Sequence, residues 1–230
     1  MNIKLFHFFP SKLNLYGDRG NIITLVKRAE WRKINIEVVE VNDVNPVDLK
    51  QADLLFIGGG SDREQLLCTE QLRSVKNELS LMIDDEVPML TICGGYQFLG
   101  DHYVTAQGET LKGLNILDFY TEARNPRLVG NIHVESEYFG KIIGFENHAG
   151  RTYHKYQSLG TVLKGYGNNG EDKTEGIFYK NVIGTYLHGP ILPNNPTIAD
   201  FLLQKSLQRR YPSIILEPLE DKLHNLIGNR

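Results

Sequence analysis

The sequence predicts an α/β fold, with a mixed sheet that is parallel in its first part, an antiparallel extension, and helices on both faces. The first observation is that short apolar runs alternate with amphipathic segments over the first 100 residues, as strands and helices do around a parallel sheet. The second is that glycine clusters follow two of these runs, at residues 58–60 and 94–95. The third is a change after Gly100, where helical periodicity gives way to short β-rich runs separated by Gly and Asn turns.

Four strands and three helices are expected in the first 100 residues. Asp18 ends a turn-rich segment and is placed to cap the first helix, because an aspartate oxygen can accept from the free N–H groups of a first turn. The expected strands cover residues 3–9, 36–41, 52–57 and 88–92, and the expected helices cover residues 19–33, 63–84 and 94–99.

The second part is expected to be an antiparallel extension of the same sheet, followed by a helix over residues 197–210. No repeat or linker interrupts the chain, so we expect one domain over residues 1–230. Its core would span about residues 1–210, and the tail 211–230 would be a weak helix or a loosely docked segment. The β-rich runs cover residues 117–121, 128–136, 141–146, 161–164, 176–179 and 182–188.

Composition excludes several classes of protein. The 230 residues are 41% hydrophobic and 23% charged, and a chain of this length hides roughly 70% of its unfolded surface. The net charge of −3 lacks the basic excess of a nucleic-acid binder. Two cysteines are too few for a disulfide scaffold or a cysteine zinc site. With no signal peptide and no membrane-spanning run visible, we expect a cytoplasmic protein.

Cys93 is the candidate nucleophile. It ends a predicted strand and is followed by Gly94 and Gly95 where a helix should start, which is the layout of a nucleophile elbow. Residues without a Cβ suit this tight turn, and free N–H groups at the start of the helix can activate a thiol and hold an oxyanion. The alternative is a buried packing cysteine, which is the expectation for Cys68 on its amphipathic helix.

A thiol nucleophile needs a base, and His188 is the first candidate. It ends a strand-like run and precedes a Gly-Pro break, which places it at the edge of the sheet where α/β proteins carry their sites. His148, in a polar turn, is the second candidate. The other five histidines have no such setting.

Two further glycine-rich segments lead to different predictions. Residues 58–60 follow a buried strand, and one of their N–H groups could join an oxyanion site. Residues 165–170 spell G-x-G-x-x-G, but no apolar helix face follows, so we expect a hairpin turn and not a dinucleotide site. The chain contains no recognisable ATP or metal motif.

Several blocks of sequence resemble the class I glutamine amidotransferases of the cobyric-acid-synthase-like branch, and among these the glutaminase subunits of lipid II isoglutaminyl synthases. The blocks are LNLYGDRGN, IGGGSDREQ, LTICGGYQFLG, GFENHAGRTY and GTYLHGPILP, spread over residues 13–193. The resemblance implies a flavodoxin-like sheet and hydrolysis of L-glutamine to glutamate and ammonia through a thioester on a cysteine.

The same resemblance assigns roles to individual residues. Cys93 would be the nucleophile and His188 the acid and base. Gln97 and Arg127 would bind the substrate, since an arginine suits its α-carboxylate. The oxyanion donors would be the N–H groups of three glycines: Gly94, Gly59 and Gly60.

The resemblance also implies a partner. The ammonia would pass to a MurT-type, Mur-ligase-like subunit that binds ATP and magnesium and amidates the D-glutamate α-carboxyl of lipid II. This chain itself would need no cofactor and no metal, and it would contact lipid II only through that partner.

Two positions depart from the class I pattern. Thr91 stands where the elbow G-x-C-x-G has its first glycine, and Pro190 stands where His-x-Glu has its acid. The site is therefore a dyad, or its acid comes from elsewhere, and our hypothesis is a carboxylate from the partner chain. Two other readings stay open: a stand-alone cysteine hydrolase or peptidase, and a binding subunit with a decayed site.

Overall fold

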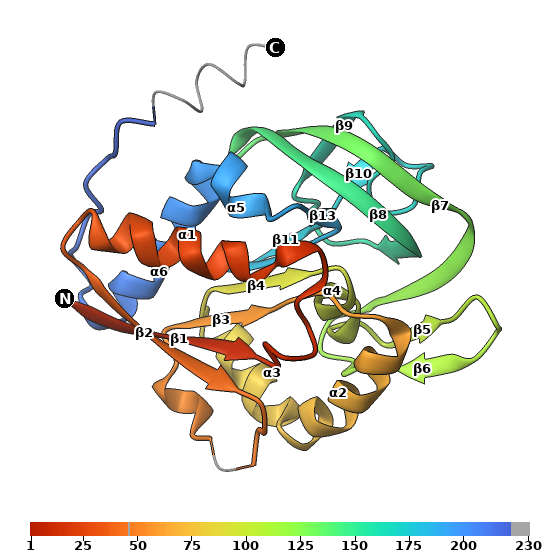
Figure 1. Ribbon diagram of the computed structural model, residues 1–230, viewed down its shortest axis with the longest axis horizontal. Helices are drawn as coiled ribbons and strands as arrows, with labels where there is room; N and C mark the ends of the chain where they lie inside the picture. Colours follow the sequence, from red (N-terminus) through yellow and green to blue (C-terminus); the bar gives the residue numbers. More distant parts are fainter. Residues whose placement is uncertain (46, 222–230) are drawn as a thin grey trace.

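The computed structural model describes residues 1–45 and 47–221. Within these residues, six strands form a sheet in the order β11-β12-β4-β3-β1-β2 (Figure 1). All neighbours are parallel except β11 and β12, so the sheet is mixed, as the sequence predicts. Its strands are β1 (Asn2–Phe8), β2 (Asn35–Val41), β3 (Leu54–Ile57), β4 (Met89–Ile92), β11 (Ile177–Tyr179) and β12 (Val182–Thr185).

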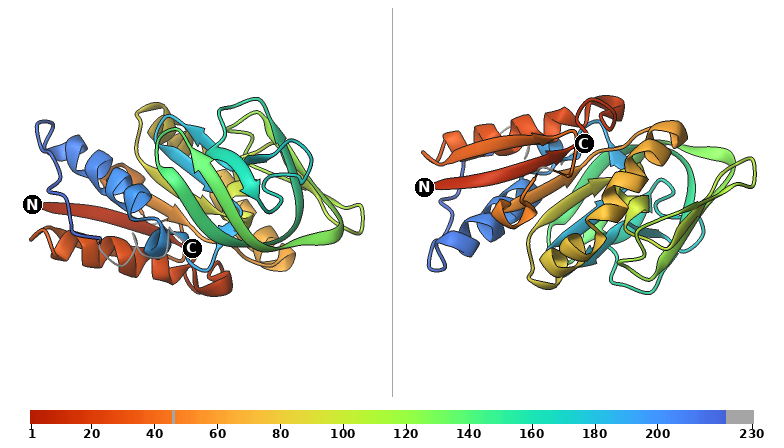
Figure 2. Two further views of the ribbon diagram at one scale, coloured as in Figure 1. Left: turned by 90° about the horizontal axis from the view of Figure 1, so that it is seen from above. Right: turned by 90° about the horizontal axis from the view of Figure 1, so that it is seen from below.

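Helices cover both faces of this sheet. The connection from β1 to β2 and the connection from β3 to β4 run in opposite directions across it, so right-handed crossovers put their helices on opposite faces. The helix after β1 lies with the last helix on one face, while the two helices after β3 lie on the other (Figures 1 and 2). The helices are α1 (Arg19–Glu30), α2 (Asp62–Ser74), α3 (Lys76–Asp84), α4 (Gly94–Phe98), α5 (Ile191–Asn194) and α6 (Pro196–Arg210), with 3-10 turns at Leu15–Gly17 and Leu49–Gln51.

The predicted helix over residues 63–84 is two helices. Val75 leaves the helical conformation, with φ −113° and ψ 17°, and its half-buried side chain packs against the core. A β-branched residue loses side-chain freedom inside a helix, so it is a favourable place for a break.

Most of the antiparallel strands form a second sheet of their own, in the order β10-β9-β7-β5-β6, with β8 paired to β7. The long hairpin of β7 and β8 dominates it, and each strand continues well beyond the shorter runs that the sequence suggests. This sheet lies beside the carboxyl ends of the first (Figure 2). Its strands are β5 (His102–Val104), β6 (Thr110–Lys112), β7 (Phe119–Ser136), β8 (Gly140–His154), β9 (Gly160–Lys164), β10 (Thr174–Glu175) and β13 (Leu187–His188).

The predicted strand over residues 182–188 is split at Tyr186, where the chain passes from the first sheet to the second. The Tyr186 N–H donates to the buried Glu175 carboxylate at 2.9 Å, and the Leu187 N–H donates to Thr185 Oγ1 at 3.0 Å. These side chains take backbone donors that would otherwise continue the ladder. β13 then pairs with β8, and His188 lies where the two sheets meet.

Neither residues 165–170 nor the described part of the tail contains a helix or a strand. Residues 165–170 form the expected turn between β9 and β10. The tail has no helix through Asp221, and it docks through Gln204, which bonds the backbone of Ile214 and Leu216. Residues 222–230 lie outside the described chain. No helix among the described residues is long and apolar enough to cross a membrane.

Candidate active site

Cys93 occupies the strand–turn–helix that the sequence predicts. It lies between β4 and α4 with φ +50° and ψ −106°, a conformation that side chains rarely adopt, and only 8% of the residue is exposed. The following helix passes so close to the end of β3 that a Cβ on Gly95 would lie 2.5 Å from the Ile57 oxygen. The turn is therefore held by close backbone packing that only glycine permits.

The side chains of His188 and Cys93 both lie against Gly59. A Cβ on Gly59 would lie 3.2 Å from Cys93 Cβ and 3.3 Å from His188 Cε1, so the glycine lets the two side chains approach the same point. Burial alone would lower the pKa of His188, but the interactions with Asp18 and Cys93 together raise it to about 10. His188 is therefore a proton acceptor that keeps its proton at neutral pH.

Asp18 is the acidic neighbour of this pair, and the sequence suggested a different task for it. It stands before α1, but its side chain makes no capping hydrogen bond there, while Asn14 Oδ1 accepts from the Arg19 N–H. Instead Asp18 Oδ2 accepts from the Gly59 N–H at 2.7 Å, and Oδ1 lies 3.8 Å from His188 Nδ1. The prediction of a helix cap is wrong because the carboxylate points toward the site.

This contact also corrects one of the predicted oxyanion donors. The Gly59 N–H is occupied by the Asp18 carboxylate, so it is not available to a substrate oxygen. Gly60 lines the cavity in front of Cys93, and its carbonyl accepts from the Gln65 amide. Gly94 packs against the same Gln65 side chain, which leaves Gly94 and Gly60 as the predicted donors.

A cavity of about 600 Å³ opens in front of Cys93, and both predicted substrate-binding residues line it. Arg127, on β7, is fixed by two bonds to Asn147 on β8: its Nε donates to Oδ1 at 2.9 Å and an Nη donates to the backbone oxygen at 2.8 Å. Gln97 donates its amide to the Tyr186 hydroxyl at 3.0 Å. Its Oε1 is buried and has no partner among the described residues, so it can accept from a ligand.

Asp62 is a cavity residue that the sequence analysis missed. Among the described residues that line the cavity it is the only one with an acidic side chain. Burial of Tyr103, helped by Asp62, raises the pKa of that phenol, which also lines the cavity. The block IGGGSDREQ contained Asp62, but nothing local distinguished it from a residue at the start of a helix.

The second histidine candidate is in the wall of the same cavity. The His148 ring stacks on Tyr186 with centroids 3.8 Å apart, and its Nδ1 lies 2.8 Å from the Gly150 oxygen. Burial lowers its pKa, so the ring is neutral at physiological pH. Cys68 is fully buried in α2, and burial raises the pKa of its thiol to about 11, as expected of a packing residue.

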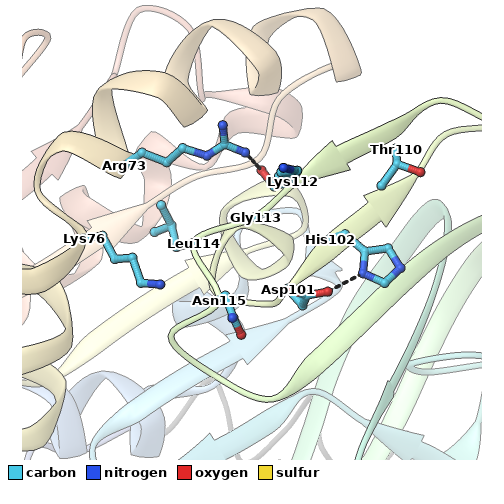
Figure 3. A pocket seen from close by; sticks show the side chains of 9 residues that line it. All are labelled: Arg73, Lys76, Asp101, His102, Thr110, Lys112, Gly113, Leu114 and Asn115. Carbon is cyan, nitrogen blue, oxygen red and sulfur yellow. Dashed lines mark hydrogen bonds and ion pairs between the residues drawn. The ribbon is translucent and has the colours of Figure 1, made fainter.

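A second cavity of about 580 Å³ lies away from Cys93, beside α2, α3 and the β5–β6 hairpin. Figure 3 shows its polar wall, in which Arg73 donates to the Lys112 oxygen and Asp101 pairs with His102. None of the predicted site residues lines it. In the described part of the chain, no group of three or more His, Cys, Asp or Glu side chains is arranged to hold a metal ion.

A strained cysteine at a strand–helix turn, a histidine from the neighbouring strand end and this arrangement of sheets define a cysteine-dependent amidotransferase domain. The chain belongs to the family of CobB/CobQ-like glutamine amidotransferase domains, which it matches over residues 4–196. It is 56% identical over 218 residues to the GatD subunit of the glutamine-hydrolysing lipid II isoglutaminyl synthase of Staphylococcus aureus, covering 95% of this chain and 89% of that protein.

Two other matches agree with this family. The GatD subunit of Streptococcus pneumoniae is 37% identical over 233 residues, covering 98% of this chain and 89% of the relative. A solved glutamine amidotransferase superposes with a TM-score of 0.62 at 18% identity, covering 87% of this chain and 98% of that one, and it shows the likeness of fold.

Proposed function

We propose that this protein is the glutaminase subunit of a lipid II isoglutaminyl synthase, hydrolysing L-glutamine to glutamate and ammonia. The observation that carries the proposal is the position of Cys93, in a strained turn beside His188, at the base of a cavity that contains Arg127 and Gln97.

In the first half of the reaction, Cys93 acts as a thiolate whose proton is held by His188, and its sulfur attacks the side-chain carboxamide carbon of glutamine. The N–H groups of Gly94 and Gly60 hold the oxyanion of the tetrahedral intermediate. His188 then gives the proton to the leaving nitrogen, the C–N bond breaks, and ammonia leaves a γ-glutamyl thioester on Cys93. A raised pKa suits this step, because the imidazolium must keep its proton until the intermediate collapses.

In the second half, His188 takes a proton from water, and the resulting hydroxide attacks the thioester carbon. The C–S bond breaks, glutamate leaves, and the thiolate of Cys93 is again paired with protonated His188. Recognition of free glutamine needs both charges of the amino acid, and we assign its α-carboxylate to Arg127 and its ammonium to Asp62. Gln97 Oε1 accepts from the carboxamide N–H₂ of the substrate.

The destination of the ammonia rests on the relatives. GatD of Staphylococcus aureus is named as a subunit of a glutamine-hydrolysing lipid II isoglutaminyl synthase. By that similarity we propose a MurT-type, Mur-ligase-like partner that binds ATP and magnesium and amidates the D-glutamate α-carboxyl of lipid II. The same proposal places this subunit in the cytoplasm.

Glutamine hydrolysis by the purified chain and by its complex with the ligase subunit tests the proposal. We expect Cys93→Ala to abolish ammonia release in both, and a glutamine analogue with an electrophilic γ-carbon to label Cys93 covalently. The variant Cys68→Ala is the matched control and should keep full activity. Full glutaminase activity of Cys93→Ala would contradict the mechanism.

The same assay separates the stand-alone reading from the subunit reading. A subunit should release ammonia faster when its partner is present, and it should leave peptides and other amides intact. Equal turnover by the isolated chain, or cleavage of a peptide, would favour a cysteine hydrolase or peptidase instead.

A further inference from the structure

We propose that a cluster of three buried hydroxyl groups fixes which end of the Gln97 side-chain amide faces the substrate. The hydroxyls of this cluster belong to Tyr186, Thr152 and Thr121. They keep the amide oxygen of Gln97 in the cavity, and the site thereby favours glutamine over its product glutamate. The inference rests on the proposed glutaminase function and concerns how the site distinguishes an amide from an acid.

The hydroxyl cluster lies where the chain passes from one sheet to the other. Thr121 and Thr152 are opposite each other on β7 and β8, and their Oγ1 atoms are 2.7 Å apart. The Tyr186 hydroxyl lies 2.6 Å from Thr152 Oγ1. None of the three residues is more than 1% exposed, so bulk water does not compete for their protons.

The direction of these hydrogen bonds follows from the number of protons. Burial raises the pKa of Tyr186, so its hydroxyl keeps one proton to donate. An amide nitrogen donates and does not accept, so the phenol oxygen accepts from Gln97 Nε2 at 3.0 Å. The phenol proton therefore goes to a threonine oxygen, and toward Gln97 the phenol is an acceptor only.

The Gln97 amide has one orientation that suits this acceptor. If the amide were turned round, its Oε1 would face a phenol oxygen whose proton is already donated elsewhere, and two acceptors would meet. In the observed orientation Oε1 is buried and accepts no hydrogen bond from the described residues, and Gln97 lines the cavity in front of Cys93. A ligand that donates to Oε1 removes the cost of leaving a buried acceptor unpaired.

Close packing leaves the contact between the amide and the phenol little room to move. The Tyr186 ring stacks on His148 with centroids 3.8 Å apart and meets the Tyr96 ring edge-on at 5.5 Å. A Cβ on Gly150 would lie 2.6 Å from Gln97 Nε2 and 2.7 Å from the Tyr186 hydroxyl oxygen. The amide nitrogen is therefore confined, and its hydrogen bond to the phenol decides how the amide is turned.

An acceptor at this place distinguishes two ligands of almost the same shape. The side chain of glutamine ends in an N–H₂ group that donates to Gln97 Oε1, whereas the ionised side chain of glutamate offers only acceptors. Size separates an amide from an acid poorly, but an unmatched polar contact in a buried site separates them strongly. The same contact favours release of glutamate once the thioester has been hydrolysed.

The test is the double variant Thr121→Val/Thr152→Val, which keeps the shape of both side chains and removes both acceptors of the phenol proton. Replacing two paired hydroxyls by apolar groups of the same shape costs little stability. The phenol should then donate to Gln97 Oε1, and the amide should turn its N–H₂ group into the cavity. Neutron diffraction from deuterium-exchanged crystals of the full chain shows the orientation directly, with the deuterated nitrogen toward Tyr186 in the wild type and the oxygen toward it in the variant.

Kinetics of the complex with the ligase subunit measure the consequence for the substrate. In the double valine variant we expect KM for glutamine to rise about tenfold and the inhibition constant of glutamate to fall about threefold, with kcat within about threefold. A merely structural role of the two threonines would weaken both ligands alike. The ratio of the two constants therefore separates orientation of the amide from loss of packing.

Two controls accompany the double valine variant. Thr121→Ser/Thr152→Ser keeps both hydroxyls and removes two methyl groups, so it should restore the wild-type ratio of the two constants within about twofold. Ser206→Ala removes a buried hydroxyl on α6 that donates to the Leu202 oxygen, away from the cavity. It should leave KM and the inhibition constant of glutamate unchanged.

A wild-type crystal in which the Tyr186 deuteron points to Gln97 Oε1 would overturn the proposal, and this measurement holds even if the double valine variant does not fold. A folded variant with the wild-type ratio of the two constants would overturn it as well. These outcomes are separate from failure of the proposed function. A wild-type complex that does not hydrolyse glutamine would refute the glutaminase, whereas the neutron structure would still report the orientation of Gln97.

Discussion

The two sheets of this protein contribute differently to its site. The first sheet carries the nucleophile Cys93 in the turn after β4, and His188 follows on β13, where the chain passes from β12 of the first sheet to the second. The second sheet supplies a substrate-binding group from within a long hairpin, where Arg127 on β7 is held by Asn147 on β8. Chemistry and recognition are thus built by different kinds of structure.

The difference lies in what fixes each group. Backbone packing fixes Cys93, because Gly95 allows α4 to approach the end of β3 within contact distance. Hydrogen bonds between side chains and backbone fix Arg127 on the surface of its hairpin. Substitutions in the first sheet should therefore change kcat and stability, while substitutions in the second should change KM.

The largest effect is expected from Gly95→Ala. The added Cβ would meet the backbone oxygens of Ile57 and Gly58 at 2.5 and 2.8 Å, and neither can move alone. We expect a loss of about 2–3 kcal/mol in the free energy of unfolding and a fall in kcat of about 100-fold or more from displacement of Cys93. Chemical denaturation and glutaminase kinetics measure both.

Gly140→Ala is the comparison for the second sheet. Gly140 lies in the β7–β8 turn with φ +67° and open space around it, so the alanine should cost about 1 kcal/mol and leave kcat unchanged. Equal effects of the two substitutions on kcat would show that close packing at Gly95 does not position the nucleophile.

The second-largest effect, an increase in KM for glutamine, is expected from Arg127→Ala. Loss of a charge-assisted bond to the α-carboxylate should raise KM for glutamine about 30-fold, with kcat changed much less. Arg124, on the same strand, is exposed, pairs with Glu122 and Glu171 and lies over the Tyr153 ring, so Arg124→Ala should leave KM within about twofold. A fall in kcat with constant KM would assign Arg127 to the chemistry and remove the distinction between the sheets.

A smaller effect is expected from Asp62→Asn. The side chain is exposed at the start of α2, and an exposed ion pair contributes less than about 1 kcal/mol, so KM should rise about fivefold. The check is competitive inhibition of glutamine hydrolysis by a glutamine analogue that lacks the α-amino group. Asp62→Asn should weaken the binding of glutamine but not the binding of the analogue. Equal weakening of both would show that Asp62 does not bind the ammonium.

The sequence predicted the first sheet well because its signals are local. A run of apolar residues ending in Cys93-Gly-Gly contains both the strand and the turn that the nucleophile needs. His188 could be selected from seven histidines for the same reason, since its strand and its Gly-Pro break are adjacent to it. Arg127 came only from resemblance to a family, because its position depends on a partner strand 20 residues away.

Asp18 shows why the rest could not be predicted. Its position before an amphipathic helix suggested a cap, and its real contacts, Gly59 and His188, are 41 and 170 residues further along the chain. The split at Tyr186 is similar, because the buried Glu175 that causes it lies on another strand. Contacts of this kind follow from the packing of the two sheets and leave no local pattern.

The smallest effect on activity is expected from substitution of Glu175, at the junction of the two sheets, and there the stability of the fold should depend on pH. Glu175 is fully buried, and burial raises its pKa to about 7 although Thr185 and the Tyr186 N–H donate to it. Because the folded pKa lies above the unfolded value, the protonated side chain favours folding below about pH 4.5, and this contribution is lost as the pH rises through 7.

Glu175→Gln keeps the acceptor for Tyr186 and removes the charge. We expect the variant to match the wild type near pH 4.5 and to exceed it by about 3 kcal/mol in free energy of unfolding at pH 8, with kcat within about twofold. Denaturant unfolding across this range measures the difference, and Glu171→Gln, at an exposed position, is the control that should show none. If the stability of Glu175→Gln and of the wild type depended on pH in the same way, the Glu175 carboxylate would remain ionised throughout this range. The Tyr186 N–H would then donate to a charged carboxylate and not to a neutral carboxyl group.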